Sequence, residues 1–253
     1  MTMLTHRFDS ALSALLPRAV TRPHRAPEVD RVVLARRSTR AFTDQEVDPA
    51  QIREILELAA RAPSGTNMQP WQAYVITRPT IARIAAKIDA CGVAPEKAQW
   101  DDYRYYPDKI PAPLNARRRA VGAALYGALG IGRRDVQAMR THFRRNLDFF
   151  GAPVGIFVTV SRRLEQGSWL DLGMFMQTLL LVAEARGLAT CTQAAFAPFH
   201  KVIRPEIGMG EDEILVCGIA LGHAEQSAPE NSFRTERAPL DDWARFVPVA
   251  AEV

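Results

Sequence analysis

The most apolar stretch of this 253-residue chain, residues 168–186, limits what the chain can fold into. Its apolar side chains would occupy nearly every face of a helix, and such a helix has to be covered on all sides. We therefore predict a central helix that is buried all round. Its most apolar part, Leu170 to Ala185, contains Asp171, Gln177 and Glu184 and is too short and too polar to cross a bilayer, so we expect no membrane partner.

Shorter patterns on both sides of this helix predict a mixture of helices and strands. Segments 71–77, 155–160 and 214–221 are rich in β-branched residues and predict strands. Apolar residues at helical spacing predict helices at 52–59 and 81–88. Because helices dominate and the strands are scattered, we predict an α+β fold rather than a regular βαβ series.

The start of the helix at 52–59 is marked by its capping residues. Asp48 is a favourable N-cap, Pro49 suits the first helical position, and Gln51 completes the pattern of a capping box. Upstream, residues 1–28 carry three prolines and predict an extended arm. Because we find no repeat and no linker beyond this arm, we predict a single domain over 29–253.

Charge and cysteine content exclude several classes of protein. The net charge is +4 and the sequence pI is about 9.2, but aromatic residues do not interleave with the basic clusters, so we expect no nucleic-acid partner. Three widely spaced cysteines argue against a disulfide framework and favour a reducing, cytoplasmic location. The chain has no Cys-x-x-Cys and no His-Glu-x-x-His, so we expect no metal site.

A tight basic cluster follows the helix expected at 28–36, on which Val29 and Val33 would share one face with Arg36. Three guanidinium groups and a hydroxyl lie between Arg36 and Arg40. Arginine stays cationic and offers a planar set of donors that suits phosphate oxygens. The cluster is therefore a candidate anion site, although a solvated basic turn would have the same residues.

A second segment favours the anion site. The two segments together resemble the nitroreductase family of FMN-dependent oxidoreductases, which pairs an Arg-x-Ser-x-Arg-x-Phe opening with a later Pro-Ser-x-x-Asn-x-Gln-Pro-Trp turn. Here the opening is Arg36, Ser38, Arg40 and Phe42, and the turn is Pro63, Ser64, Asn67, Gln69, Pro70 and Trp71. The likeness extends over roughly residues 29–246. It implies a mostly antiparallel central sheet flanked by helices, in an intertwined homodimer with FMN at the subunit interface.

The resemblance also implies which residues bind FMN. The phosphate would lie near Arg36 and Ser38, with Arg237 reaching in from the C-terminal segment, and Arg40 would lie at the pyrimidine edge of the flavin. The turn would serve the flavin of the opposite subunit. The implied cofactor-binding residues are Arg36, Arg37, Ser38, Arg40, Pro63, Ser64, Gly65, Asn67, Gln69, Ala194, Ala195 and Arg237.

Several of these residues have simpler explanations. Arg40 could pair with Asp44 or Glu46, Arg237 could pair with Glu236 or Asp241, and Trp71 could be a packing residue at the start of a strand. The chain also departs from the family. Thr235 stands where the family often has Lys, so a phosphate contact could be lost or moved to Arg234, and Gly65 stands where the family often has Ser.

The segment 190–196 resembles the family's loop after the central helix, whose backbone N–H groups face the flavin. Ala194 and Ala195 replace an acidic residue and a glycine, which keeps the backbone donors and removes any side-chain role. Cys191 could be a redox partner, but we favour a small buried residue because no second cysteine is near in sequence.

Aromatic residues cluster in the irregular segment 91–115, which is typical of a lid or a binding loop. We predict that Tyr105, Tyr106 and Phe143 line an aromatic substrate slot, with Phe149 and Phe150 as further candidates. The arginines of 117–145 fit a solvated helical face, or contacts with NADPH phosphates or an acidic substrate.

The function that the resemblance implies is electron transfer from NADPH or NADH to nitroaromatic or similar electron-poor acceptors, by a ping-pong mechanism and without an essential general base. The same scaffold serves reductive dehalogenases, ene-reductases and heterocycle dehydrogenases. A flavin-binding or nucleic-acid-binding protein without turnover is the alternative from another class. The glycines at 127–132 do not form a dinucleotide fingerprint, and no Gly-x-Ser-x-Gly motif supports a serine hydrolase.

Overall fold

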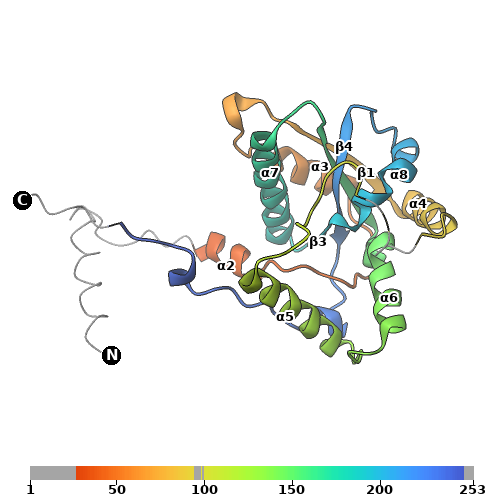
Figure 1. Ribbon diagram of the computed structural model, residues 1–253. Helices are drawn as coiled ribbons and strands as arrows, with labels where there is room; N and C mark the ends of the chain where they lie inside the picture. Colours follow the sequence, from red (N-terminus) through yellow and green to blue (C-terminus); the bar gives the residue numbers. More distant parts are fainter. Residues whose placement is uncertain (1–26, 94–97, 99, 248–253) are drawn as a thin grey trace, which may run out of the picture. The chain divides into compact units, whose positions relative to one another are not determined.

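The computed structural model describes residues 27–93, 98 and 100–247. The chain divides into two compact units, one of Val32–Arg234 and one of Met1–Arg31 with Thr235–Val253. Most of the arm expected at 1–28 lies outside the described residues. The sheet and its helices belong to the first unit (Figure 1).

The predicted α+β class is confirmed by a four-stranded antiparallel sheet in the order β1-β2-β4-β3. Three of its strands coincide with the predicted segments: β1 (Trp71–Thr77), β2 (Val154–Ser161) and β4 (Glu213–Gly222). The fourth strand, β3 (Ala189–Gln193), occupies part of the segment expected to be a loop. A short 3-10 helix, η4 (Ala194–Phe199), follows it and accounts for the rest of that segment.

Helices surround this sheet and connect its strands (Figure 1). The three longest are α7 (Gln166–Ala185), α5 (Ala112–Ala128) and α4 (Arg78–Ala90). The shorter ones are α3 (Pro49–Ala59), α6 (Val136–Arg144) and α8 (His200–Ile207), with 3-10 turns η1 (Gly65–Asn67), η3 (Arg145–Gly151) and η5 (Pro229–Asn231). The helix α2 (Pro27–Ala35) crosses the boundary between the two units, and η6 (Leu240–Asp242) belongs to the second unit.

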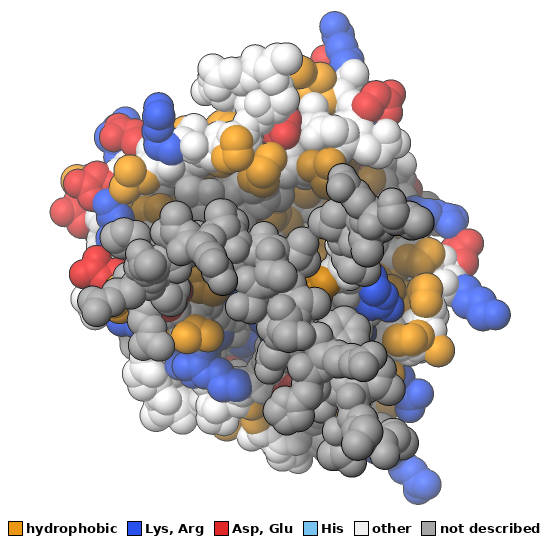
Figure 2. Space-filling model, turned by 90° about the vertical axis from the view of Figure 1, so that its left-hand side faces the viewer, with side chains coloured by type: hydrophobic (Ala, Val, Ile, Leu, Met, Phe, Trp, Pro, Cys, Tyr) orange, Lys and Arg blue, Asp and Glu red, His pale blue; other side chains and the backbone are white. Residues whose placement is uncertain are grey.

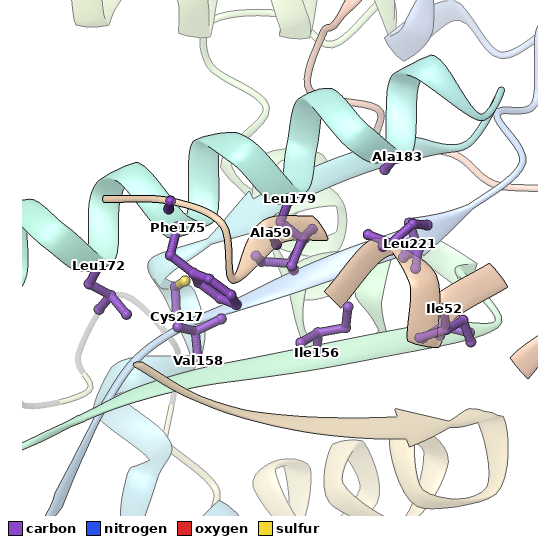
Figure 3. Packing of buried hydrophobic residues seen from close by; sticks show 14 of the residues in the cluster. Ile52, Ala59, Ile156, Val158, Leu172, Phe175, Leu179, Ala183, Cys217 and Leu221 are labelled. Atoms are coloured by element: carbon purple, nitrogen blue, oxygen red, sulfur yellow. The ribbon is translucent and has the colours of Figure 1, made fainter. Parts of the chain in front are cut away.

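The sheet separates two apolar layers because alternate side chains of a strand point to opposite faces. On one face α3 and α7 pack against β2 and β4, and Figure 3 shows Leu172, Phe175 and Leu179 of α7 directed at Ile156 and Val158 of β2. On the other face α4 and α8 pack with η3 and η4. The sheet is thus covered on both sides.

Three phenylalanine rings form the centre of the second layer. Phe149, Phe157 and Phe196 lie with ring centroids 4.4–5.4 Å apart. Gly218 on β4 makes room for them, because a Cβ there would lie 2.6 Å from the Phe196 ring. Phe149 and Phe150 are buried in this layer at 0% and 2% exposure, so the prediction that they line a substrate slot is wrong.

Two helices bury only one face each within the described part of a single chain. On α2 the buried residue is Val32, while Val29 and Val33 are exposed. On α7 only the face toward the sheet is buried: Leu170 is 72% exposed and Met174 is 39% exposed. Within the described part of one chain, this second face of the most apolar helix stays exposed, and its burial in an assembly stays a prediction.

The start of α3 agrees with its sequence in part. Asp48 caps the helix by accepting a hydrogen bond from the Ala50 N–H at 2.8 Å, and Pro49 is its first residue. Gln51 does not complete a capping box, because its side-chain amide donates to the Arg186 carbonyl at 3.4 Å. The side chain thus connects α3 to the end of α7.

Candidate functional site

The basic segment 36–40 lies alongside the edge strand β3. The Arg36 N–H bonds to the Val32 carbonyl at 3.0 Å as α2 ends, and the Thr39 N–H donates to the Thr190 carbonyl at 2.9 Å. Ser38 and Thr190 form an isolated parallel bridge. This pairing fixes the backbone of the arginine cluster against the sheet, as predicted for a turn just beyond a helix.

Asn231 attaches the same segment to a second part of the chain. Its side chain is 2% exposed, accepts a hydrogen bond from the Arg40 N–H at 2.8 Å, and donates to the carbonyls of Ala41 and Glu225, each at 2.9 Å. No sequence motif pointed to this residue. Asparagine is seldom fully buried, so its burial here marks Asn231 as a residue with a structural role, but this burial can be recognised only in the structure.

Positive charge gathers around this segment. The pKa of Arg37 is lowered first by its partial burial and then by the neighbouring charge of Arg234. The negative charge of Glu184 partly offsets this lowering. Arg234 donates to the Ala35 carbonyl at 3.0 Å. Guanidinium groups held this close repel one another, so an anion bound between them would be stabilised.

The alternative partners suggested for Arg40 are engaged elsewhere. Asp44 and Glu46 both pair with Arg78, at 3.2 Å and 3.4 Å. The Arg40 guanidinium instead donates to the Ser38 carbonyl at 3.3 Å. It is half-buried and keeps donor groups that this single bond leaves open.

The turn at 63–71 has an unusual backbone. Thr66, Asn67 and Gln69 have positive φ angles of 48°, 60° and 51°. Left-handed conformations are uncommon outside glycine and often occur at functional sites. The Ser64 hydroxyl holds the turn by accepting from the Gln69 N–H at 3.0 Å, while Gly65, Asn67 and Gln69 remain exposed.

Two contacts fasten this turn to the first half of α7. The Gly65 N–H donates to the buried Asp171 carboxylate at 3.1 Å, and the Trp71 ring stacks on Phe175 with centroids 5.0 Å apart. Trp71 is therefore a packing residue, as favoured from the sequence. The signal for Asp171 was a lone carboxylate near the start of an apolar helix.

The segment 190–196 begins as β3 and ends in η4, where Ala194 and Ala195 are half-buried. The Gln193 side chain donates to the Asn146 carbonyl at 2.7 Å and so ties the strand end to η3. Burial raises the pKa of the Cys191 thiol to about 11, despite the opposing charges of Arg40 and Arg36. A protonated, buried thiol fits the packing role that we predicted for Cys191.

Arg237 lies in the other compact unit and is exposed. Its guanidinium donates to the Thr235 hydroxyl at 2.8 Å and to the carbonyls of Thr235 and Glu236. The partners are therefore neutral oxygens rather than the carboxylates suggested as alternatives. Its contact with a phosphate stays a prediction.

In the aromatic segment Tyr103 is anchored to the sheet, whereas Tyr105 and Tyr106 are exposed. The Tyr103 hydroxyl donates to the Val216 carbonyl at 2.5 Å, and its ring packs edge-on against Trp100 and Trp169. Tyr105 and Tyr106 contact each other with centroids 4.7 Å apart and are 55% and 52% exposed.

Phe143 does not join these tyrosines within one chain. It lies on α6 and is 38% exposed. Among the described residues, no ring contact links it to Tyr105 or Tyr106. No ring contact thus joins the three residues predicted to line one substrate slot in the described part of the chain, and their common role stays a prediction.

The two main motifs are fastened to opposite ends of α7. The turn at 63–71 is bonded to Asp171, whereas Arg37 interacts with Glu184. Asp171 and Glu184 are thirteen positions apart on α7, which corresponds to about 20 Å along the axis at roughly 1.5 Å per residue. A single chain thus holds its basic segment and its strained turn far apart.

Comparison with known proteins decides the family. The nitroreductase family model matches residues 33–223, which include both motifs and all four strands. The chain belongs to the nitroreductase family. A 4-nitrobenzoate reductase of Nocardioides sp. (strain LMS-CY) is 39% identical, over 93% of this chain and 98% of its own length. A nitrobenzene nitroreductase of Ectopseudomonas oleovorans is 38% identical, over 88% and 98%.

A solved nitroreductase structure has the same fold. The FMN and NADPH-dependent nitroreductase NfnB of "sphigopyxis sp. strain HMH" superposes with a TM-score of 0.83 at 39% identity, covering 87% of this chain and 98% of that one. The expected nitroreductase-like architecture, with a mostly antiparallel sheet flanked by helices, is therefore confirmed.

Other kinds of site have less support in the part of the chain that the structure describes. No group of three or more His, Cys, Asp or Glu side chains there could hold a metal ion, and none of its helices is long and apolar enough to cross a membrane. On the face shown in Figure 2, Lys and Arg side chains lie at separated places among hydrophobic and acidic ones.

Proposed function

We propose that this nitroreductase-family chain is an FMN-dependent oxidoreductase that transfers electrons from NADPH or NADH to nitroaromatic or similar electron-poor acceptors. The similarity to a 4-nitrobenzoate reductase and to a nitrobenzene nitroreductase, each over most of both chains, supports this reaction. The similar solved structure is that of an FMN and NADPH-dependent enzyme, which supports the cofactor and the donor. The three cysteines of this chain are all free, which fits a reducing, cytoplasmic compartment.

The observation that carries the proposal is the arginine cluster held beside β3. Arg37 and Arg234 repel each other, and the pKa of Arg37 is lowered by its partial burial and then by that repulsion. A phosphate monoester would relieve the repulsion and accept several charge-assisted hydrogen bonds. The residues present therefore fit the phosphate of FMN, with Ser38 as an exposed neutral donor.

The protein would supply binding and electrostatics rather than a general base. Bound FMN supplies the redox chemistry, because flavins accept a hydride and pass electrons on. Arg40, whose backbone is fixed by Asn231, would place a positive charge near the pyrimidine edge. Backbone N–H groups at Ala194 and Ala195 would offer neutral donors to the ring.

We propose a ping-pong order, in which the nicotinamide nucleotide leaves before the acceptor enters the same space. Support comes from the family resemblance and from the absence of a separate dinucleotide fingerprint in the sequence. Initial rates measured at several fixed acceptor concentrations should give parallel double-reciprocal lines. Intersecting lines would refute the order of binding without affecting the proposed cofactor.

The FMN site would be completed by a second copy of the chain. The basic segment and the 63–71 turn lie at opposite ends of α7, so two antiparallel α7 helices would bring the turn of one subunit to the basic segment of the other. The exposed residues Leu170, Gly173, Met174 and Gln177 recur at helical spacing on α7 and form a stripe suited to such a contact.

Leu170→Glu tests this arrangement, because it places a charge on the most exposed leucine of the proposed contact. We expect the variant to elute as a monomer and to lose FMN together with its dimeric state. Leu58→Glu is the matched control, since Leu58 is a 41% exposed leucine on α3, outside the stripe. A Leu170→Glu variant that stays dimeric and yellow would refute the arrangement.

The direct test of the function is the visible absorption of the purified protein, followed by anaerobic titration with NADPH. We expect a flavin spectrum that bleaches on titration and returns when nitrobenzene is added. Parallel assays with halophenols and activated alkenes would separate nitroreduction from the dehalogenase and ene-reductase alternatives. Protein that neither carries nor takes up FMN would refute the proposal.

A further inference from the structure

An apolar pocket lies between the aromatic segment and the first half of α5. It measures about 400 Å³, which is a volume that suits a small aromatic ligand. Ile110, Leu114 and Val121 supply apolar wall, together with two prolines. Tyr106 and Arg118 are its two polar members, and both come from outside the motifs that define the family likeness.

Arg118 gives this pocket a positive charge that no carboxylate of the described residues balances. Its guanidinium lies over the Tyr106 ring, 5.1 Å from the centroid, and no carboxylate among the residues that the structure describes pairs with it. A cation over an aromatic face keeps its attraction for an anion, because the ring carries no net charge. An apolar wall next to an unpaired guanidinium suits an amphiphilic anion.

The neighbouring pocket is a useful contrast. It measures about 360 Å³ and is lined by Trp100, Tyr105, Asp101, Arg104 and Asp108. There the charges are balanced, since Arg104 pairs with Asp108 at 3.0 Å, and Asp101 pairs with Lys201 outside the pocket. Of these two pockets, the one at Arg118 combines mostly apolar walls with a guanidinium that pairs with no described carboxylate.

The helix that carries Arg118 also reaches the neighbourhood of Arg40. The far end of α5 packs against η5, which contains Asn231, and the Tyr126 ring lies edge-on to His142. His142 in turn lies within the electrostatic influence of Arg40. One helix therefore connects the pocket with the segment that we propose to bind the flavin.

We propose that this pocket recognises the acceptor, and that it selects aromatic rings carrying an anionic substituent, such as nitrobenzoates and nitrophenolates. The inference rests on the proposed function and specifies its substrate class. The ring lies against Ile110, Leu114 and Val121, and the carboxylate or phenolate accepts hydrogen bonds from Arg118. Such charge-assisted bonds are about twice as strong as neutral ones.

Arg118→Ala tests the inference when two acceptors that differ in charge are compared on the FMN-loaded enzyme. We expect KM for 4-nitrobenzoate to rise about 10-fold or more, in line with the loss of a charged hydrogen bond, while KM for nitrobenzene changes less than about twofold. Arg118→Lys should fall between wild type and Arg118→Ala, because lysine keeps the charge without the planar donors. Arg117→Ala, one residue away and outside the pocket, is the matched control.

The ratio of the two KM values decides the result. If the ratio of KM for 4-nitrobenzoate to KM for nitrobenzene rises for Arg118→Ala but not for Arg117→Ala, the inference is supported. An unchanged ratio overturns it, and this is also the result expected if a partner subunit fills the pocket. Calorimetric binding of benzoate, which is not reduced, gives a second readout. Benzoate affinity that drops only in Arg118→Ala would uphold the pocket even if neither nitro compound were reduced, so failure of the two proposals can be distinguished.

Discussion

Replacement of Asn231 by Ala would test how the basic segment is held in place. The Asn231 side chain is the buried link between residues 40–41 and the 225–231 segment, through hydrogen bonds to the Arg40 N–H and to the carbonyls of Ala41 and Glu225. Alanine removes all three bonds and leaves a cavity in a site that is 2% exposed.

The expected loss follows from these contacts. Three hydrogen bonds at roughly 1 kcal/mol each, together with an Arg40 N–H left without its partner, amount to about 3–4 kcal/mol of unfolding free energy. The Ala41 carbonyl keeps one bond, from the Glu225 N–H at 3.0 Å, so the full penalty of unpaired groups is not reached. Loss of a fixed Arg40 should also weaken FMN binding about 10-fold or more, which corresponds to about 1.4 kcal/mol.

Urea unfolding of the FMN-free protein would measure the first effect, and fluorescence titration with FMN the second. Asn231→Asp should be at least as destabilising at neutral pH, because it keeps the acceptor for Arg40 but sets a negative charge against two carbonyl oxygens. Ser232→Ala is the control, since it removes one exposed hydrogen bond to Pro229 from the same turn. An Asn231→Ala variant within about 0.5 kcal/mol of wild type would refute the reasoning.

Two further predictions concern packing and pH. Gly218→Ala should lower the unfolding free energy by about 1–3 kcal/mol, because its Cβ would lie 2.6 Å from the Phe196 ring. Gly127→Ala should raise it by about 0.5–1 kcal/mol, because Gly127 lies in open space on α5. Thermal unfolding of the two variants checks these opposite signs. Burial lowers the pKa values of His142 and His200 below 6.5, so the unfolded chain binds more protons than the folded one as the pH falls through this value. The unfolding free energy should therefore fall between about pH 7 and pH 5, by at most about 1.4 kcal/mol per pH unit for each histidine, and a double Gln variant should show a flatter profile in urea unfolding.

The elements with strong local patterns could be predicted from the sequence. The strands at 71–77 and 154–161 and the buried face of α4 agree with their predicted residues because periodicity alone specifies them. The strand β3 was missed because its five residues, Ala189–Gln193, show no clear alternation of apolar and polar side chains. Its pairing with β4 is a contact between distant segments, which local propensity does not encode.

The candidate site divides in the same way. Motifs identified the 36–40 and 63–71 segments, yet nothing in them pointed to Asn231 or Asp171, which hold them in place. Supporting residues are chosen by the three-dimensional path of the backbone, and many polar residues could serve. Phe149 and Phe150 show the opposite error, since aromatic character suggested a ligand surface where the fold used it for packing.

The exposed second face of α7 and the separation of the two motifs would have a common explanation in a second copy of the chain. A helix as apolar as α7 is expected to be covered on all sides, yet Leu170 and Met174 remain exposed. The same helix holds the strained turn at one end and the basic segment near the other. An antiparallel contact between two α7 helices would cover the exposed stripe and join the two halves of the site at once. In that arrangement cofactor binding and dimer formation stabilise each other, so excess FMN should shift a dissociating Leu170→Glu variant back toward the dimer.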